Sequence, residues 1–138
     1  MSSLDFAWEV EKISNELTTL GYKVSIPFTI EKIINRKMSL KNVLKHKKQN
    51  DFFIYTRDND LIKRNFDRIN QANAVLILNL DKNGIKNYIG GNTFLEIGLA
   101  HVLGKKIFLY NQIPNMIYTD EIKAMNPTVI NQQLNKIT

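Results

Sequence analysis

The segment Ala74–Leu80 (AVLILNL) constrains the fold of this chain more than any other. It is continuously apolar except for one asparagine, so we expect both of its faces to be covered, as in a central strand of a parallel sheet. A second apolar run, Ile107–Tyr110, follows after a segment with helical periodicity. Strands that alternate with helices in this way predict an α/β fold, with a parallel sheet between two layers of helices.

Periodicity and turn residues predict the other elements. Apolar side chains recur at steps of four and three over residues 4–20, which predicts an amphipathic helix that ends at Gly21. Together these elements imply a sheet of about four to five strands. We further predict a strand over Tyr22–Phe28, one helix or two short helices over 30–50, a helix or a short strand over Asp51–Thr56, helices over 58–72, 93–103 and 119–125, and a last strand over 128–130.

The size and composition of the chain fit one globular domain over residues 1–138. There is no cysteine, no apolar run of about 18 residues and no signal-peptide pattern, so we expect a cytoplasmic protein without disulfides or a membrane partner. Chains of this class commonly begin with a central strand, whereas this one begins with a helix. Either the fold lacks that first strand or the sequence starts downstream of it.

Positive charge is concentrated in one third of the chain. Between Lys32 and Arg68 there are eleven Lys and Arg residues and four Asp residues, a net charge of +7, whereas the rest of the chain has a net charge of −1. This pattern suggests a local face that attracts anions. The run Lys32–Lys48 fits a solvated helix surface better than a nucleic-acid site, because it lacks aromatic interleaving and a docking motif.

The loop Asp81–Asn92 (DKNGIKNYIGGN) follows the predicted central strand. Ligands of open α/β sheets bind beyond the carboxyl ends of the strands. Loops at that edge usually have about 2–6 residues, so one this long is often functional, although a plain surface loop is the alternative. Two glycines and a helix start then offer close backbone approach and amide donors for a phosphate or carboxylate. The expected substrate-binding residues are Asn87, Tyr88, Gly90, Gly91, Asn92, Thr93 and Asn111.

Three of the polar side chains in this region have two interpretations. Glu96 fits a capping box with Thr93, in which its carboxylate would bond only the helix start, but it could also point into the pocket as a nucleophile or electrostatic stabiliser. Asp81 could be a second carboxylate or part of an Asp-Lys-Asn-Gly turn. Tyr88 could stack on a ligand or cover the core. No metal site is predicted, since His46 and His101 are far apart and unaccompanied.

Residues 72–111 resemble the nucleoside 2-deoxyribosyltransferase-like superfamily, which includes deoxyribosyltransferases and nucleotide N-glycoside hydrolases. The resemblance rests on a buried strand, a glycine-containing loop, Glu96-Ile97-Gly98 followed by Ala100, and Gly104-Lys105 before the next strand. It implies a flavodoxin-like sheet with Glu96 as the nucleophile that attacks C1′ of a (deoxy)ribose, while Asp81 and Asn111 support the reaction. It also implies a nucleoside or nucleotide substrate, no cofactor, and a homodimer or higher homo-oligomer.

Two other functions remain open at this point. The same fold could serve as a non-catalytic nucleotide-binding sensor in which Glu96 only caps its helix, because a fold does not determine a function. The basic run could bind nucleic acid, although we expect no nucleic-acid partner. Release of free base by the wild-type chain, and its loss in Glu96→Ala, would separate the enzyme from these alternatives.

Overall fold

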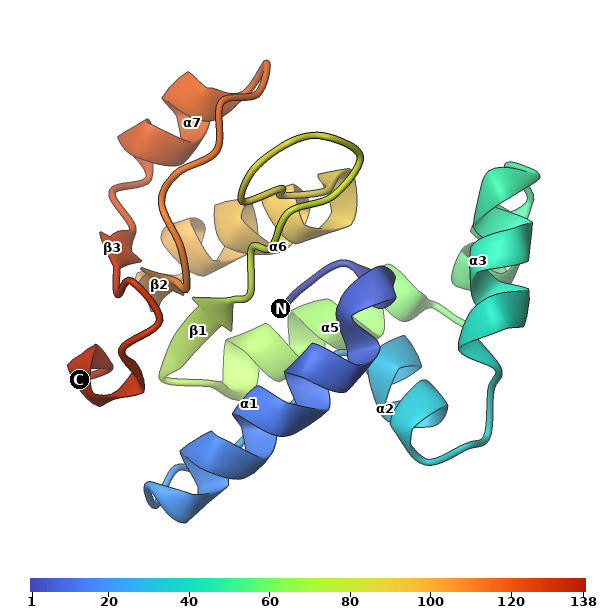
Figure 1. The fold of residues 1–138 in the computed structure, drawn as a ribbon, viewed down its shortest axis with the longest axis horizontal. Helices are drawn as coiled ribbons and strands as arrows, with labels where there is room; N and C mark the ends of the chain where they lie inside the picture. Colours follow the sequence, from blue (N-terminus) through green and yellow to red (C-terminus); the bar gives the residue numbers. More distant parts are fainter. The chain divides into compact units, whose positions relative to one another are not determined.

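The computed structural model describes all 138 residues, which form two compact units. We call Met1–Ser3 together with Ile69–Thr138 the sheet unit, and Leu4–Arg68 the helical unit. No helix in either unit combines the length and the apolar character that crossing a lipid bilayer requires. The elements are labelled in Figure 1.

The sheet unit contains a small parallel sheet with strand order β1-β2-β3. Its elements, in chain order, are β1 (Ala74–Ile77), α6 (Gly91–Val102), β2 (Lys106–Leu109), α7 (Thr119–Ala124), β3 (Thr128–Val129) and the 3-10 helix η2 (Leu134–Lys136). Val75 pairs with Ile107, and Phe108 pairs with Thr128. Each strand is therefore separated from the next by a helix, and all three strands end at the same edge.

The core of the sheet unit forms where α6 packs against β1 and β2. Ile77 and Leu109 of the strands and Ile97 and Ala100 of α6 are all fully buried. The spacing of Ile97 and Ala100 places both on one face of the helix, and burying these apolar side chains supplies most of the driving force for packing.

The helical unit has no strand. It contains the 3-10 helix η1 (Leu4–Phe6) and the helices α1 (Ala7–Thr19), α2 (Phe28–Ile34), α3 (Leu40–Lys48), α4 (Phe52–Asp58) and α5 (Leu61–Gln71), the last of which continues into the sheet unit. The apolar stripe of α1, which includes Val10, Ile13 and Leu17, is buried, as are Ile30 and Ile33 of α2. Contacts between α1 and α2 bring these two sets together.

The α/β class is confirmed, but the sheet has three strands rather than four to five. The predicted strand over Tyr22–Phe28 is wrong, because residues 22–27 have no regular structure and Phe28 begins α2. Side chains of α5 satisfy this backbone in place of a neighbouring strand. Asn65 Oδ1 accepts from the Phe28 N–H at 3.0 Å, and Arg68 donates to the Ile26 carbonyl.

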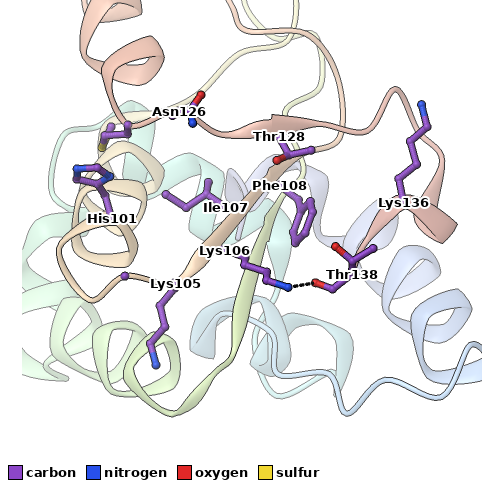
Figure 2. Close-up of a pocket in the computed structure, with 11 residues that line it drawn as sticks. His101, Lys105, Lys106, Ile107, Phe108, Asn126, Thr128, Lys136 and Thr138 are labelled. Atoms are coloured by element: carbon purple, nitrogen blue, oxygen red, sulfur yellow. Dashed lines mark hydrogen bonds between the residues drawn. The ribbon is translucent and has the colours of Figure 1, made fainter.

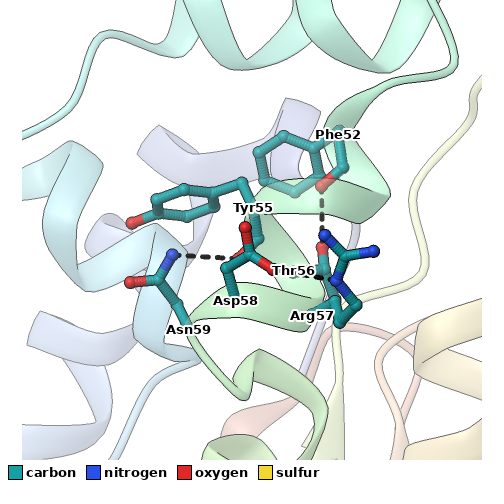
Figure 3. Close-up of polar contacts among 6 residues, drawn as sticks. All are labelled: Phe52, Tyr55, Thr56, Arg57, Asp58 and Asn59. Atoms are coloured by element: carbon teal, nitrogen blue, oxygen red, sulfur yellow. Dashed lines mark hydrogen bonds and ion pairs between the residues drawn. The ribbon is translucent and has the colours of Figure 1, made fainter.

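The alternative of a short strand over Asp51–Thr56 is also wrong, because α4 covers most of this segment (Figure 3). Its aromatic and β-branched residues favour a strand by composition, yet Phe53 and Ile54 are 61% and 44% exposed. Two side chains instead donate to carbonyls four residues earlier, a spacing typical of a helix. Thr56 Oγ1 donates to the Phe52 carbonyl at 3.1 Å, and Asn59 Nδ2 donates to the Tyr55 carbonyl at 3.0 Å. Arg57 pairs with its neighbour Asp58 at 2.8 Å, and this hydrogen bond raises the Arg57 pKa.

Candidate functional site

Asn79 connects the carboxyl ends of β1 and β2. Its side chain is fully buried, and its Nδ2 donates to the carbonyls of Gln112 at 2.9 Å and Asn111 at 3.3 Å. Its Oδ1 accepts from the Asn111 N–H at 2.9 Å. A buried amide is stabilising only when its polar atoms are paired, and here all of them are. Asn79 therefore fixes the edge of the sheet at which ligands of this class bind.

Asn111 completes the same connection. Its Nδ2 donates to the Asn79 carbonyl at 3.0 Å, and its Oδ1 accepts from Gln132 Nε2 at 2.9 Å. Both polar atoms of the Asn111 side chain thus bond protein groups. In this conformation the residue joins the strand ends, whereas we had expected it to face a substrate.

Asp81 and Asn87 close the loop after β1. Asp81 Oδ1 accepts from the Asn87 N–H at 2.9 Å, and Asp81 is exposed. Asn83, Gly84 and Asn87 have φ values of 53°, 74° and 57°, the left-handed region that asparagine and glycine tolerate best. The Asp81 carboxylate therefore stabilises a compact loop in this structure. This agrees with the interpretation of Asp81 as part of a turn.

Tyr88 lies over Gly90 at the end of this loop. A Cβ atom at Gly90 would stand 3.3 Å from Tyr88 Cε1, so glycine leaves room for the ring. The Lys82 ammonium lies 5.4 Å from the centre of the Tyr88 ring and donates to Ser3 Oγ at 2.8 Å. Ser3, Lys82 and Tyr88 form a polar group beside the glycines, whereas Gly91 and Asn92 are exposed.

The start of α6 differs from the prediction in a way that concerns Glu96. The helix begins at Gly91 with Gly90 as N-cap, two residues earlier than expected, and the Phe94 N–H donates to the Gly90 carbonyl at 2.8 Å. Thr93 is therefore a buried residue of the first turn rather than the cap, and Glu96 lies in the second turn. The capping-box interpretation is wrong, because a capping glutamate must lie three residues after the N-cap.

Glu96 is buried, with 5% of its surface exposed. Its charge acts on the α-amino group of Met1, whose nitrogen donates to the Leu76 carbonyl at 2.6 Å. Burial lowers the pKa of the Met1 α-amino group below its ordinary value of 8.0, and the Glu96 carboxylate partly opposes this effect. A carboxylate in an apolar interior is stable only with a compensating partner, so Glu96 is an unusual residue for this helix to contain.

Tyr118 contacts the end of the Asp81–Asn92 loop and the first turn of α6. Its hydroxyl donates to the carbonyl of Ile89, and its ring stacks on Phe94 with 4.4 Å between the ring centres. Burial raises the pKa of the Tyr118 phenol, and the nearby Tyr88 adds to the effect. Two loop tyrosines therefore lie near each other next to the first turns of α6.

Sequence reasoning missed Asn79, Lys82, Ser3 and Tyr118. For Asn79 a signal was present, since it is the one polar residue in an otherwise apolar strand segment. For the other three there was none, because their roles depend on contacts between segments far apart in the sequence.

No group of three or more His, Cys, Asp and Glu side chains that could hold a metal ion occurs in the chain. A cavity of about 520 Å³ lies elsewhere in the sheet unit, at the amino ends of the strands. We place the candidate site at the carboxyl edge nonetheless, because Glu96 and the long loop lie there and because ligands of this fold class bind at that edge. Searches against models of protein families, curated proteins and solved structures found no match to this chain.

Proposed function

We propose that this chain cleaves the N-glycosidic bond of a (deoxy)nucleoside or its 5′-monophosphate, with Glu96 as the nucleophile. The observation that carries the proposal is the buried Glu96 carboxylate in the second turn of α6, where it cannot act as a helix cap. Glycosidic chemistry of the retaining type needs such a carboxylate at the anomeric carbon. The resemblance of residues 72–111 to deoxyribosyltransferases supports the same role for Glu96. It also supports a three-layer, flavodoxin-like arrangement.

The proposed reaction has two steps. The Glu96 carboxylate forms a bond to C1′ while the bond from C1′ to the base nitrogen breaks, and the base leaves with that electron pair and takes up a proton. In the second step water, or the nitrogen of another base, attacks C1′ and loses its own proton, and Glu96 leaves again as a carboxylate. The transition states resemble an oxocarbenium ion, which a nearby negative charge stabilises.

The loop residues have supporting roles in this proposal. Tyr88, with the Lys82 ammonium over one side of its ring, offers an aromatic surface for a base. Asp81 and Asn87 fix the shape of the loop, and Asn111 fixes the strand ends. Gly90 lets the backbone and the Tyr88 ring lie close together.

The test is to incubate the full chain with deoxynucleosides and their 5′-monophosphates and to measure released base by chromatography. Glu96→Gln keeps the size of the side chain and removes its charge, so base release should fall by a factor of about 10³ or more. The matched control is Asp120→Asn, an exposed carboxylate of α7 in the same unit, and this variant should retain full activity.

The sensor function predicts a different pattern. In that case neither wild type nor Glu96→Gln releases base, but nucleotides raise the melting temperature of both. Equal base release by wild type and Glu96→Gln would show that another group carries the activity, and would contradict the proposal directly.

A further inference from the structure

The loop Asp81–Asn92 contains a tight turn with an asparagine and a glycine at its centre. Lys82 and Ile85 form an isolated antiparallel bridge, in which the N–H of each residue donates to the carbonyl of the other, at 3.0 Å and 2.9 Å. Between them, Asn83 and Gly84 have φ values of 53° and 74°. Two positive φ values are typical of a type I′ turn, for which Asn-Gly is a favoured pair.

This pair of residues can undergo a covalent reaction without an enzyme. Asn83 is the only asparagine of the chain that precedes a glycine, so no side chain obstructs the approach of the next backbone nitrogen to its amide carbon. When the Gly84 nitrogen bonds to that carbon, a five-membered succinimide ring closes, and the side-chain nitrogen takes up the Gly84 N–H proton and leaves as ammonia. Water then opens the ring at either carbonyl and returns a proton to the Gly84 nitrogen. Aspartate or isoaspartate remains in place of asparagine.

The two groups that react are not engaged in other contacts. Neither the Asn83 side chain nor the Gly84 N–H takes part in a hydrogen bond, and both residues are exposed. A Cβ atom at Gly84 would meet nothing within 4 Å, so there is space beside the glycine in which the ring can form. The backbone bonds between Lys82 and Ile85 hold the turn, and exposed loop bonds of this kind open at a small cost in free energy.

We propose that Asn83 is a site of spontaneous deamidation in the folded chain, and that the reaction alters the loop between β1 and α6. Isoaspartate adds a methylene group to the backbone between Lys82 and Ile85, so the reciprocal bonds of the turn are lost. Both products also add a carboxylate next to Lys82 in the chain. The Lys82 ammonium donates to Ser3 Oγ at 2.8 Å and lies 5.4 Å from the centre of the Tyr88 ring, and the new charge competes for it.

The test is to incubate the full folded chain for several weeks at body temperature and mildly alkaline pH. A more acidic form should appear on ion-exchange chromatography, because a neutral amide becomes a carboxylate, and peptide mapping by mass spectrometry should assign the change to Asn83. The acidic form should be lost in Asn83→Gln, since glutamine has to close a larger and less favourable ring. The isolated isoaspartate form should melt at a lower temperature than Asn83→Asp, which adds the charge without the extra methylene group.

Two other asparagines are internal controls. Asn50 is exposed and has a φ of 57°, but it precedes Asp51. Asn126, at the cavity drawn in Figure 2, is exposed and has a φ of 51°, but it precedes Pro127, whose nitrogen carries no proton to transfer. We expect both to stay unmodified during the period in which Asn83 reacts.

Three results would overturn the proposal. One is deamidation of Asn83 in urea but not in the folded chain, which would show that the turn protects it. Another is modification of Asn50 and Asn126 as fast as Asn83, which would show that the following glycine has no effect. The third is an isoaspartate form that melts at the same temperature as the unmodified chain, which would show that the loop is unaltered. None of these measurements involves base release, so failure here and failure of the proposed function can be told apart.

Discussion

The sheet unit and the helical unit place their polar side chains differently. Four of the five buried polar residues, among them Asn79 and Glu96, belong to the sheet unit, and Thr29 is the only one in the helical unit. The helical unit instead has seven Lys and Arg residues and no acidic residue between Lys32 and Lys48. A buried polar group must be bonded precisely to be tolerated, whereas an exposed charge contributes little to stability.

This difference indicates where single substitutions should act. In the sheet unit, polar side chains fix the ends of strands and the loop between β1 and α6, so their loss should be costly. In the helical unit, charges lie mostly outside an apolar helix core, so effects should be smaller and should depend on salt. The predictions below test this contrast, starting with the largest effect.

Replacing Asn79 by leucine should destabilise the protein by about 2–4 kcal/mol. Leucine has a similar size, but it leaves the Asn111 N–H and the Gln112 carbonyl without their partner at the end of the sheet. Urea denaturation measures the effect as a shift of the midpoint. The matched control is Asn115→Leu at an exposed position, for which we expect a change within about 0.5 kcal/mol. Equal effects in the two variants would show that the Asn79 bonds do not hold the strand ends.

Replacing Arg68 by methionine tests a group of polar contacts in the helical unit, and a loss of about 1–2 kcal/mol is expected. The guanidinium donates to the Ile26 carbonyl, pairs with Glu31 at 2.6 Å and lies 5.7 Å from the centre of the Phe28 ring. Glu31→Gln removes only the ion pair, and since that carboxylate is 45% exposed the loss should be about 0.5 kcal/mol or less. If Glu31→Gln is as damaging as Arg68→Met, surface charge matters more in this unit than we infer.

Tyr118→Phe should cost about 1 kcal/mol at neutral pH, because the hydrogen bond to the Ile89 carbonyl is lost while the stacking on Phe94 stays. The variant should also change the alkaline pH dependence. Burial raises the pKa of the Tyr118 phenol above its ordinary value of 10.0, so the folded state favours the neutral form. That stabilisation is complete below about pH 10 and is lost as the pH rises from there toward the folded pKa. Thermal unfolding across this range should show a smaller decline for Tyr118→Phe, and an identical decline would contradict the assignment.

The sequence predicted the sheet unit better than the helical unit for a physical reason. Apolar runs such as Ala74–Leu80 and Ile107–Tyr110 have few structures open to them, and the predicted strands and helices of this unit lie within a few residues of those observed. Tyr22–Phe28 and Asp51–Thr56 are as β-rich in composition, but their structure depends on side chains of α5 and on local helix bonds. Tertiary context overrides such weak propensities.

The place of the long loop was predictable from the sequence, but its contacts were not. The loop follows β1 and leads into α6, as the sequence indicated. The spacing of Thr93 and Glu96 fits a capping box, but the structure shows that the N-cap is Gly90. The sequence alone did not show where the helix begins. Asn79 stood out as the one polar residue in an apolar segment, but its role could not be predicted because its partners lie in the loop after β2.

The smallest predicted effect is a gain in stability, and it concerns the basic surface of the helical unit. Lys41 is the second residue of α3 and is exposed, and Lys45 lies one turn further on the same face. The Lys41 ammonium is repelled both by the positive end of the helix dipole and by the Lys45 ammonium four residues later. Lys41→Glu reverses both effects and should stabilise the chain by about 0.5–1 kcal/mol at low salt, measured by urea denaturation.

The control for this prediction is Lys48→Glu at the last residue of the same helix, where a cation complements the dipole. We expect this variant to be destabilised, although both substitutions lower the net charge by the same amount. In about 1 M salt, where the screening length falls to roughly 3 Å, both effects should shrink. If instead both variants gain stability equally, the total charge of the helical unit controls its stability, and the local geometry of α3 does not.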